Sequence, residues 1–180
     1  GYNYQQRPDY TRSIFTTKFG YQWMQTQNAR HYLNPLEVNF VNIYNESDTF
    51  KTRLDNLQDK LLVNTFSPHL TTTTNYTYIF SNQSLNKKGN FSYFKVRLES
   101  SGNILRGIMA AAEAKKDTNN SYRILGIPFS QYLKYEVDYR KYWQVNNFST
   151  LVARVHHGLG YPLLNLGVLP FESAFFGGGA

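Results

Sequence analysis

The stretch FSYFKVRLES, residues 91–100, alternates between two kinds of side chain. Phe94, Val96 and Leu98 point to one side of an extended chain, and the charged residues between them point to the other side. The stretch QYLKYEVDYR, residues 131–140, repeats this pattern. Alternation with a period of two predicts β-strands that have one apolar face and one charged face.

Further segments alternate in the same way, so the chain is expected to form about seven strands. The additional segments span residues 2–6, 13–23, 36–44, 70–80 and 150–158. From residue 25 onward the connections alternate in length, being short at 25–35, long at 45–68, short at 82–90, long at 102–128 and short at 145–147. Bacterial barrels show this alternation because one rim carries tight turns and the other carries large loops. The pattern favours an all-β fold, an antiparallel transmembrane β-barrel.

The composition of the chain agrees with a barrel wall. Aromatic residues make up 17% of the 180 residues and charged residues also 17%, whereas soluble domains hold about 25% charged residues. The sequence has no run of about 18 apolar residues, so transmembrane helices are excluded. A barrel strand needs no such run, because apolar side chains facing lipid alternate with polar side chains facing the lumen.

Charge, cysteine content and motifs exclude several classes of site. The net charge is +7, but Lys and Arg are scattered and are balanced locally by Glu and Asp, so no nucleic-acid partner is expected. The absence of cysteine excludes disulfides, thiolate-ligated metals and cysteine nucleophiles. No serine nucleophile motif, phosphate-binding glycine loop or zinc-protease signature occurs. We expect neither an enzyme nor a bound cofactor.

The two faces of the strands are assigned by the cost of placing charge in lipid. An Arg or Lys on the lipid side at mid-bilayer costs about 2–4 kcal/mol, so mid-strand charges should face a wet lumen. The predicted lumen-facing polar ladder comprises Lys95, Arg97, Glu99, Lys134, Glu136, Asp138, Arg140, Arg154 and His156. The predicted lipid-facing residues are Phe94, Val96, Leu98, Leu133, Tyr135, Val137, Leu151 and Val155. Lys141 departs from the pattern at a strand end, where a long side chain can snorkel.

One pair of carboxylates within the ladder invites a catalytic interpretation. Glu136 and Asp138 share a strand face about 7 Å apart, a separation that some glycosidases use. Lys134 and Arg140 flank them on the same face. A lumen ion-pair ladder accounts for all four residues, whereas catalysis accounts for two of them, so we predict no catalytic residue.

The histidines do not predict a metal site. His156 and His157 are adjacent, so they point to opposite faces of a strand and cannot chelate one ion together. His31 and His69 fall in predicted turns or at strand edges, where solvated histidines are expected.

The long connection after Tyr44 contains a predicted amphipathic helix. Ser47, Asp48 and Thr49 can supply its N-cap. Its apolar face would be formed by Phe50, Leu54, Leu57, Leu61 and Leu62. We interpret it as a helix that lies on the barrel rim, in a long extracellular loop. Residues 104–116 are a second helix candidate.

The C-terminal stretch from Arg154 to Gly178 resembles the BamA/TamA family of outer-membrane assembly proteins, also called the bacterial surface antigen family. The residues that carry the resemblance are RVHHGLGYP at 154–162, LPFE at 169–172 and FFGG at 175–178. The segments RPDYTR at 7–12, FGYQW at 19–23, HYLNPL at 31–36 and LESSGN at 98–103 are similar to central barrel strands of the TamA-like branch found in Bacteroidetes.

This resemblance implies that residues 1–180 are the central part of one outer-membrane barrel domain of roughly sixteen strands. Both ends would be truncated, with the POTRA domains absent and the family's arginine motif expected beyond Ala180. In the family, a Pro-Phe segment and a Phe-x-Gly-Gly turn introduce a loop that folds back into the barrel. The implied loop-seating motif comprises Leu169, Pro170, Phe171, Phe175, Phe176, Gly177 and Gly178.

The function implied by the resemblance is non-enzymatic insertion, assembly or translocation of proteins at the bacterial outer membrane. The implied partners are membrane lipid, nascent outer-membrane proteins as clients, and a periplasmic partner of the TamB type or the Bam lipoproteins. Two alternatives stay open at this point. One is a passive porin with an open lumen, and the other is a soluble β-sandwich or lipid-binding barrel.

Overall fold

The computed structural model describes residues 1–56, 63, 66–83, 89–117, 120–165, 167, 169–170 and 173–175. Seven antiparallel strands form one sheet, in which each strand pairs with the next strand of the sheet along the chain. The strands are β1 (Tyr2–Gln6), β2 (Thr11–Thr26), β3 (Ala29–Tyr44), β4 (His69–Ser81), β5 (Phe91–Ser101), β8 (Tyr132–Gln144) and β9 (Thr150–Pro162). The all-β, antiparallel prediction is confirmed.

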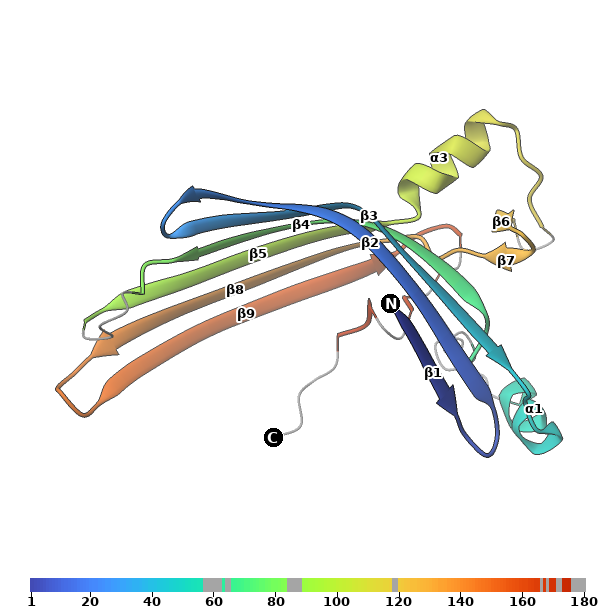
Figure 1. The fold of residues 1–180 in the computed structure, drawn as a ribbon, viewed down its shortest axis with the longest axis horizontal. Coiled ribbons are helices and arrows are strands. Elements are labelled where there is room, and N and C mark those ends of the chain that lie inside the picture. Colours follow the sequence, from blue (N-terminus) through green and yellow to red (C-terminus); the bar gives the residue numbers. More distant parts are fainter. Residues whose placement is uncertain are drawn as a thin grey trace.

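The sheet is a single curved layer with two open edges (Figure 1). β1 lies at one edge and β9 at the other, so the described strands do not close into a barrel. The β2–β3, β4–β5 and β8–β9 connections lie at one end of the strands. The opposite end carries the long connections, which contain α1 (Asp48–Asp55), α3 (Asn103–Ala111), β6 (Arg123–Ile124) and β7 (Ile127–Pro128).

β2 and β3 are longer than the sequence predicts. Each has 16 residues. Only Gln27 and Asn28 separate them. The predicted connection at residues 25–35 is therefore wrong, because residues 29–35 belong to β3.

A bulge explains how β3 accommodates Pro35, the residue that argued for a loop. The β3–β4 register shifts between Asn34 and Glu37. Proline is tolerated at such a bulge because the ladder needs no N–H donor there. The carbonyl oxygen of Pro35 still accepts a hydrogen bond from Thr74 Oγ1 at 2.8 Å. A tertiary register shift thus overrides the local turn signal.

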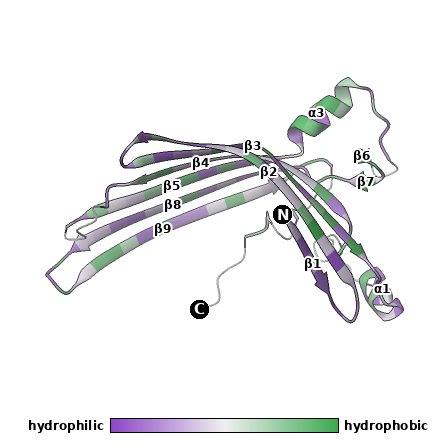
Figure 2. Cartoon of the chain, viewed as in Figure 1, coloured by the Kyte–Doolittle hydropathy of each residue, from purple (hydrophilic) through white to green (hydrophobic). Residues whose placement is uncertain are grey.

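The two faces of the sheet differ in chemistry, and hydrophobic and hydrophilic bands alternate along the strands in Figure 2. The register aligns these bands across neighbouring strands. Val96 lies opposite Tyr78 on one side and Val137 on the other. Lys95 pairs with Asp138. Residues of one kind therefore form continuous rows on one face.

α1 packs against the β1–β2 turn. Its N-cap is Ser47, whose Oγ accepts a hydrogen bond from the Phe50 N–H at 3.3 Å, as predicted. The Phe50 ring stacks on Tyr10 at 5.2 Å and meets Phe66 edge-on at 5.2 Å. Three predicted positions of its apolar face, Leu57, Leu61 and Leu62, lie outside the described residues.

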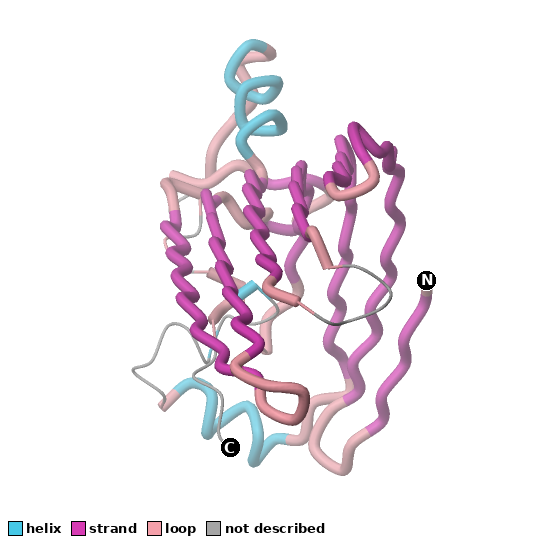
Figure 3. Tube along the Cα trace, turned by 90° about the vertical axis from the view of Figure 1, so that its left-hand side faces the viewer, coloured by secondary structure: helices cyan, strands magenta, loops and turns pink. Residues whose placement is uncertain are grey.

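Buried apolar side chains gather near the long-connection end of the sheet. Phe129 is fully buried and forms a parallel bridge with Leu70 of β4. The Ser130 N–H donates to Leu70 O at 2.9 Å. The second helix candidate, at residues 104–116, is observed as α3, which projects away from the strands in Figures 1 and 3. The small β6–β7 hairpin beyond it was not predicted.

Candidate functional site

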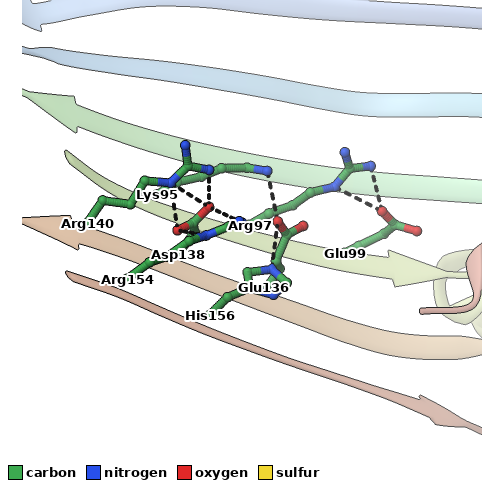
Figure 4. Close-up of polar contacts among 8 residues, drawn as sticks. All are labelled: Lys95, Arg97, Glu99, Glu136, Asp138, Arg140, Arg154 and His156. Carbon is green, nitrogen blue, oxygen red and sulfur yellow. Dashed lines mark hydrogen bonds and ion pairs between the residues drawn. The ribbon is translucent and has the colours of Figure 1, made fainter. Parts of the chain in front are cut away.

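Charged residues of β5, β8 and β9 lie together on one face of the sheet (Figure 4). The β5–β8 register places Lys95 opposite Asp138 and Glu99 opposite Lys134. This polar face holds every residue of the predicted ladder, namely Lys95, Arg97, Glu99, Lys134, Glu136, Asp138, Arg140, Arg154 and His156. Opposite charges face each other across β5 and β8, whereas Arg140 faces Arg154 across β8 and β9.

Asp138 is the centre of the strongest interaction on this polar face. Its carboxylate is buried and accepts hydrogen bonds from Arg140 Nη2 at 2.5 Å and Arg154 Nη2 at 2.9 Å. The Nε atom of each arginine also donates to it at 3.1 Å. Charge-assisted, bidentate contacts of this kind are among the stronger hydrogen bonds in proteins. They tie β8 to β9 at this point.

Glu136, two residues before Asp138 on β8, is the second carboxylate of the ladder that accepts from several basic side chains. Lys95 Nζ donates to Glu136 Oε1 at 3.0 Å, and His156 Nε2 lies 3.4 Å from the same oxygen. The carboxylate therefore links β5, β8 and β9. Glu136 and Asp138 are thus both engaged by basic side chains.

Glu99 connects the ladder to the segment that follows β9. Arg97 Nη2 donates to Glu99 Oε2 at 2.7 Å, and the hydroxyl of Tyr132 donates to Glu99 Oε1 at 2.7 Å. The Tyr132 oxygen also lies 2.8 Å from Ser173 Oγ. Lys134 Nζ donates to the main-chain oxygen of Ser173 at 2.7 Å. The segment after β9 thus folds back onto the polar face.

Two glycines of β9 form the seat for this fold-back segment, which we define as the described residues after β9, namely 163–165, 167, 169–170 and 173–175. A Cβ on Gly158 would stand 2.5 Å from Phe175 Cζ. A Cβ on Gly160 would stand 2.7 Å from Leu169 Cδ1. Lys134 Nζ lies 4.2 Å from the centre of the Phe175 ring, within cation–π range. Absence of side chains at both glycines lets the segment approach the strand.

The structure describes three of the seven residues of the predicted loop-seating motif. Leu169 and Phe175 contact the β9 seat, and Pro170 is fully buried. The other predicted members, Phe171, Phe176, Gly177 and Gly178, lie outside the described residues. The seat itself was not predicted, although glycines at alternate positions of one strand face are a recognisable sign of close approach.

Asn165 is a second residue that the sequence did not single out. Its side chain is almost fully buried. Its Oδ1 accepts from the Tyr122 N–H at 2.8 Å, and its Nδ2 donates to Tyr122 O at 3.1 Å and Phe129 O at 2.8 Å. Ser121 Oγ donates to the Asn165 carbonyl oxygen. Asn165 therefore clamps the fold-back segment to the connection between α3 and β8.

A polar cavity of about 440 Å³ opens beside the fold-back segment. Glu99, Lys134 and Ser173 line one side of it. The remaining lining residues come mostly from β2, β3 and β4 and are Ile14, Thr16, Glu37, Asn39, Val41, Thr71, Thr73, Arg97, Tyr132 and Glu136. With mixed charges and hydroxyl groups, this cavity suits water or polar main-chain groups better than an apolar ligand.

The opposite face of the sheet, which we call the apolar face, is largely uncovered. The predicted lipid-facing residues all lie on it: Phe94, Val96, Leu98, Leu133, Tyr135, Val137, Leu151 and Val155. Val155 is 66% exposed, Leu151 59% and Leu98 51%. Among the described elements only α3 approaches this face, at its margin. Lys141 also points to it and donates to Ser92 Oγ at 2.9 Å.

Two histidine predictions are wrong. His31 does not lie in a turn but within β3 on the apolar face, stacked on Trp23 at 4.9 Å with its Nδ1 2.8 Å from Tyr76 Oη. His69 is not solvated but fully buried, with its Nδ1 donating to Ser67 O at 2.8 Å. The longer β3 explains the first error, and the packing of Phe129 against the start of β4 explains the second.

Within the described part of the chain, no three His, Asp or Glu side chains gather in a way that could hold a metal ion. His156 and His157 lie on opposite faces, where His157 stacks on Tyr135 at 5.4 Å. None of the described helices combines the length and apolar character needed to cross a membrane. No protein-family model, curated protein or solved structure matches the chain.

Proposed function

We propose that this chain is part of the wall of a bacterial outer-membrane β-barrel of the BamA/TamA type, which inserts, assembles or translocates other outer-membrane proteins without enzymatic chemistry. The observation that carries the proposal is the fold-back segment, which is seated on the polar face while the apolar face is left uncovered. One face would contact lipid, and the other would enclose a lumen that the segment partly fills.

The uncovered apolar face supports a lipid environment. In water, a contiguous field of large apolar and aromatic side chains is an aggregation hazard, whereas in a bilayer it is the expected barrel exterior. A soluble sandwich would bury this face under a second sheet, but the other described sheet is only the two-stranded β6–β7 hairpin. In the proposed barrel of roughly sixteen strands, the free edges of β1 and β9 pair with neighbouring strands of the same protein.

The fold-back segment favours an assembly function over a passive porin. A diffusion pore needs an open lumen, but here Ser173 and Phe175 rest on the polar face through Tyr132, Lys134 and Gly158. A held segment can instead brace the barrel wall. Barrels of this type have a lateral seam, where the first and last strands of the barrel meet. Clients would be nascent outer-membrane proteins whose strand edges pair with that seam by β-augmentation. A periplasmic partner of the TamB type or the Bam lipoproteins would deliver them.

The test uses the full-length protein folded into lipid vesicles. Heat-modifiable gel mobility reports the barrel, and the folding rate of a small unfolded outer-membrane protein added to the vesicles reports assembly. We expect faster client folding with the wild-type protein than with empty vesicles, and less acceleration with Gly158→Val. Leu159→Val, on the apolar face of the same strand, is the matched control. Large, ungated conductance without client acceleration would establish the porin and overturn the proposal.

A further inference from the structure

α3 is an apolar helix that exposes its apolar side chains. It spans Asn103–Ala111 and contains no buried residue. Ile104 is 65% exposed and Ile108 is 60% exposed, and the spacing of four residues places them on one side of the helix. A helix with this surface is stabilised when an apolar phase covers it.

The helix stands beside the apolar face of the sheet rather than over the polar face. Ile104, Leu105 and Ile108 line a crevice of about 150 Å³ together with Leu36 of β3 and Thr74 of β4. The crevice therefore lies between the apolar side of α3 and the apolar face of the sheet. In the proposed barrel, α3 would lie at the rim and outside the lumen.

A wider apolar hollow continues from this crevice along the sheet. It measures about 470 Å³, and Thr74 and Ser100 contribute to both spaces. Leu98, Leu133 and Tyr161 form its walls. Small side chains lie between large apolar ones in this depression.

Basic side chains lie next to the apolar helix. Arg106 and Lys116 both stand over the ring of Tyr122, at 5.6 Å and 5.3 Å from its centre. The Nη1 atom of Arg106 is buried and has no hydrogen-bond partner among the described residues. Lys115 is exposed beside them, while Glu113 is the exposed acidic residue of this connection. An apolar helix side, with Arg on the other side of the helix and Lys just beyond its end, is the pattern of interfacial helices that bind anionic lipid.

We propose that α3 and the adjoining hollow form a lipid-binding site on the outside of the wall. Ile104 and Ile108 enter the acyl layer, the hollow holds an acyl chain, and Lys115, Lys116 and Arg106 bind a phosphate-bearing headgroup. This inference rests on the proposed membrane function, because it takes the apolar face to be in lipid. A lipid is the occupant because the connection that contains α3 carries both exposed apolar side chains and exposed basic ones, as the two parts of such a molecule require.

Depth measurements on the full-length protein in vesicles test the apolar part. The chain has no cysteine, so single cysteines at Ile108, Leu125 and Leu133 can carry nitroxide labels. We expect the Ile108 label to be accessible to oxygen and shielded from nickel ethylenediaminediacetate. Leu125, 96% exposed between β6 and β7, is the water-exposed control. Leu133 is the wall control.

The three labels separate the possible failures. A Leu133 label in lipid with an Ile108 label in water would overturn the helix inference and leave the barrel proposal standing. Both labels in water would overturn the barrel proposal and this inference together. An Ile108 label shielded from both reagents would mean that protein covers the helix, which also overturns the lipid site.

Headgroup binding is tested by native mass spectrometry of the full-length protein with phosphatidylglycerol or phosphatidylcholine. Lys115→Gln/Lys116→Gln should weaken phosphatidylglycerol binding by about fivefold for each charge removed, and phosphatidylcholine binding little. Lys51→Gln/Arg53→Gln on α1 removes the same charge as a control. Equal weakening by both double variants would overturn the assignment, as would displacement of phosphatidylglycerol by excess inorganic phosphate, which would indicate a simple anion site.

Discussion

Gly158 lies directly beneath the ring of Phe175, and a Cβ on this glycine would stand 2.5 Å from Phe175 Cζ. The strand and the segment that returns over it come this close because Gly158, like Gly160 next to Leu169, carries no side chain. The contact joins β9 to the fold-back segment at the place where Lys134 also lies over the Phe175 ring. It makes Gly158 the most direct probe of the fold-back segment.

Gly158→Val should release this segment from the polar face. Overpacking of this kind costs about 1–3 kcal/mol, which corresponds to roughly 5- to 150-fold in the opening equilibrium. The measurement is amide hydrogen exchange of residues 169–175 in the folded full-length protein. Exchange should accelerate in Gly158→Val and stay near the wild-type rate in Leu159→Val. Unchanged exchange in the valine variant would contradict the seat.

Asp138→Asn should destabilise the sheet where β8 meets β9. The substitution leaves Arg140 and Arg154 close together without the carboxylate that accepts from both. We expect a loss of about 1–3 kcal/mol in the free energy of unfolding, because hydrogen bonds to charged groups contribute on this scale. Glu113→Gln, at an exposed position after α3, should change it by less than about 0.5 kcal/mol.

Urea unfolding in vesicles, followed by gel mobility, measures both variants. Adding Arg154→Gln to Asp138→Asn should recover part of the loss, since one of the two unpaired cations is removed. If the free energy lost by the double variant equalled the sum of the losses of the two single variants, Asp138 and Arg154 would not be energetically coupled.

Val137→Arg should hinder membrane insertion much more than Lys95→Ala. Val137 lies on the apolar face, where an arginine near the bilayer centre costs about 2–4 kcal/mol. Lys95→Ala removes one ion pair with Glu136 from the polar face, where water can replace it. The fraction of heat-modifiable protein after folding into vesicles gives the comparison. Val96→Arg should behave like Val137→Arg, and equal effects of all three variants would contradict the assignment of the faces.

Asn165→Ala should loosen the connection between α3 and β8. The substitution leaves the buried N–H and carbonyl of Tyr122 and the carbonyl of Phe129 without the side chain that pairs them. Each unsatisfied buried group costs about 1–3 kcal/mol. Hydrogen exchange of residues 121–131 should accelerate. Asn147→Ala, at an exposed turn, should leave that region unchanged, and equal protection in both variants would exclude the clamp.

The sequence alone determined the strand-rich fold and the chemistry of its faces. In residues 91–100 and 131–140, the alternation of charged and apolar side chains specifies which residues share a face, since adjacent side chains of a strand point in opposite directions. It also located β1, β4 and β5 to within one residue at each end. It failed at β3, because Pro35 signals a turn locally and only pairing with β4 shows that a bulge absorbs it.

Only the tertiary structure decided which residues meet across the chain. The sorting of charges does not reveal that Asp138 takes two arginines while Glu136 takes Lys95 and His156, because these choices depend on side-chain reach across the register. The seat at Gly158 and the clamp at Asn165 were equally hidden. Both depend on the fold-back segment, whose position is set by contacts between residues far apart in sequence rather than by any local pattern.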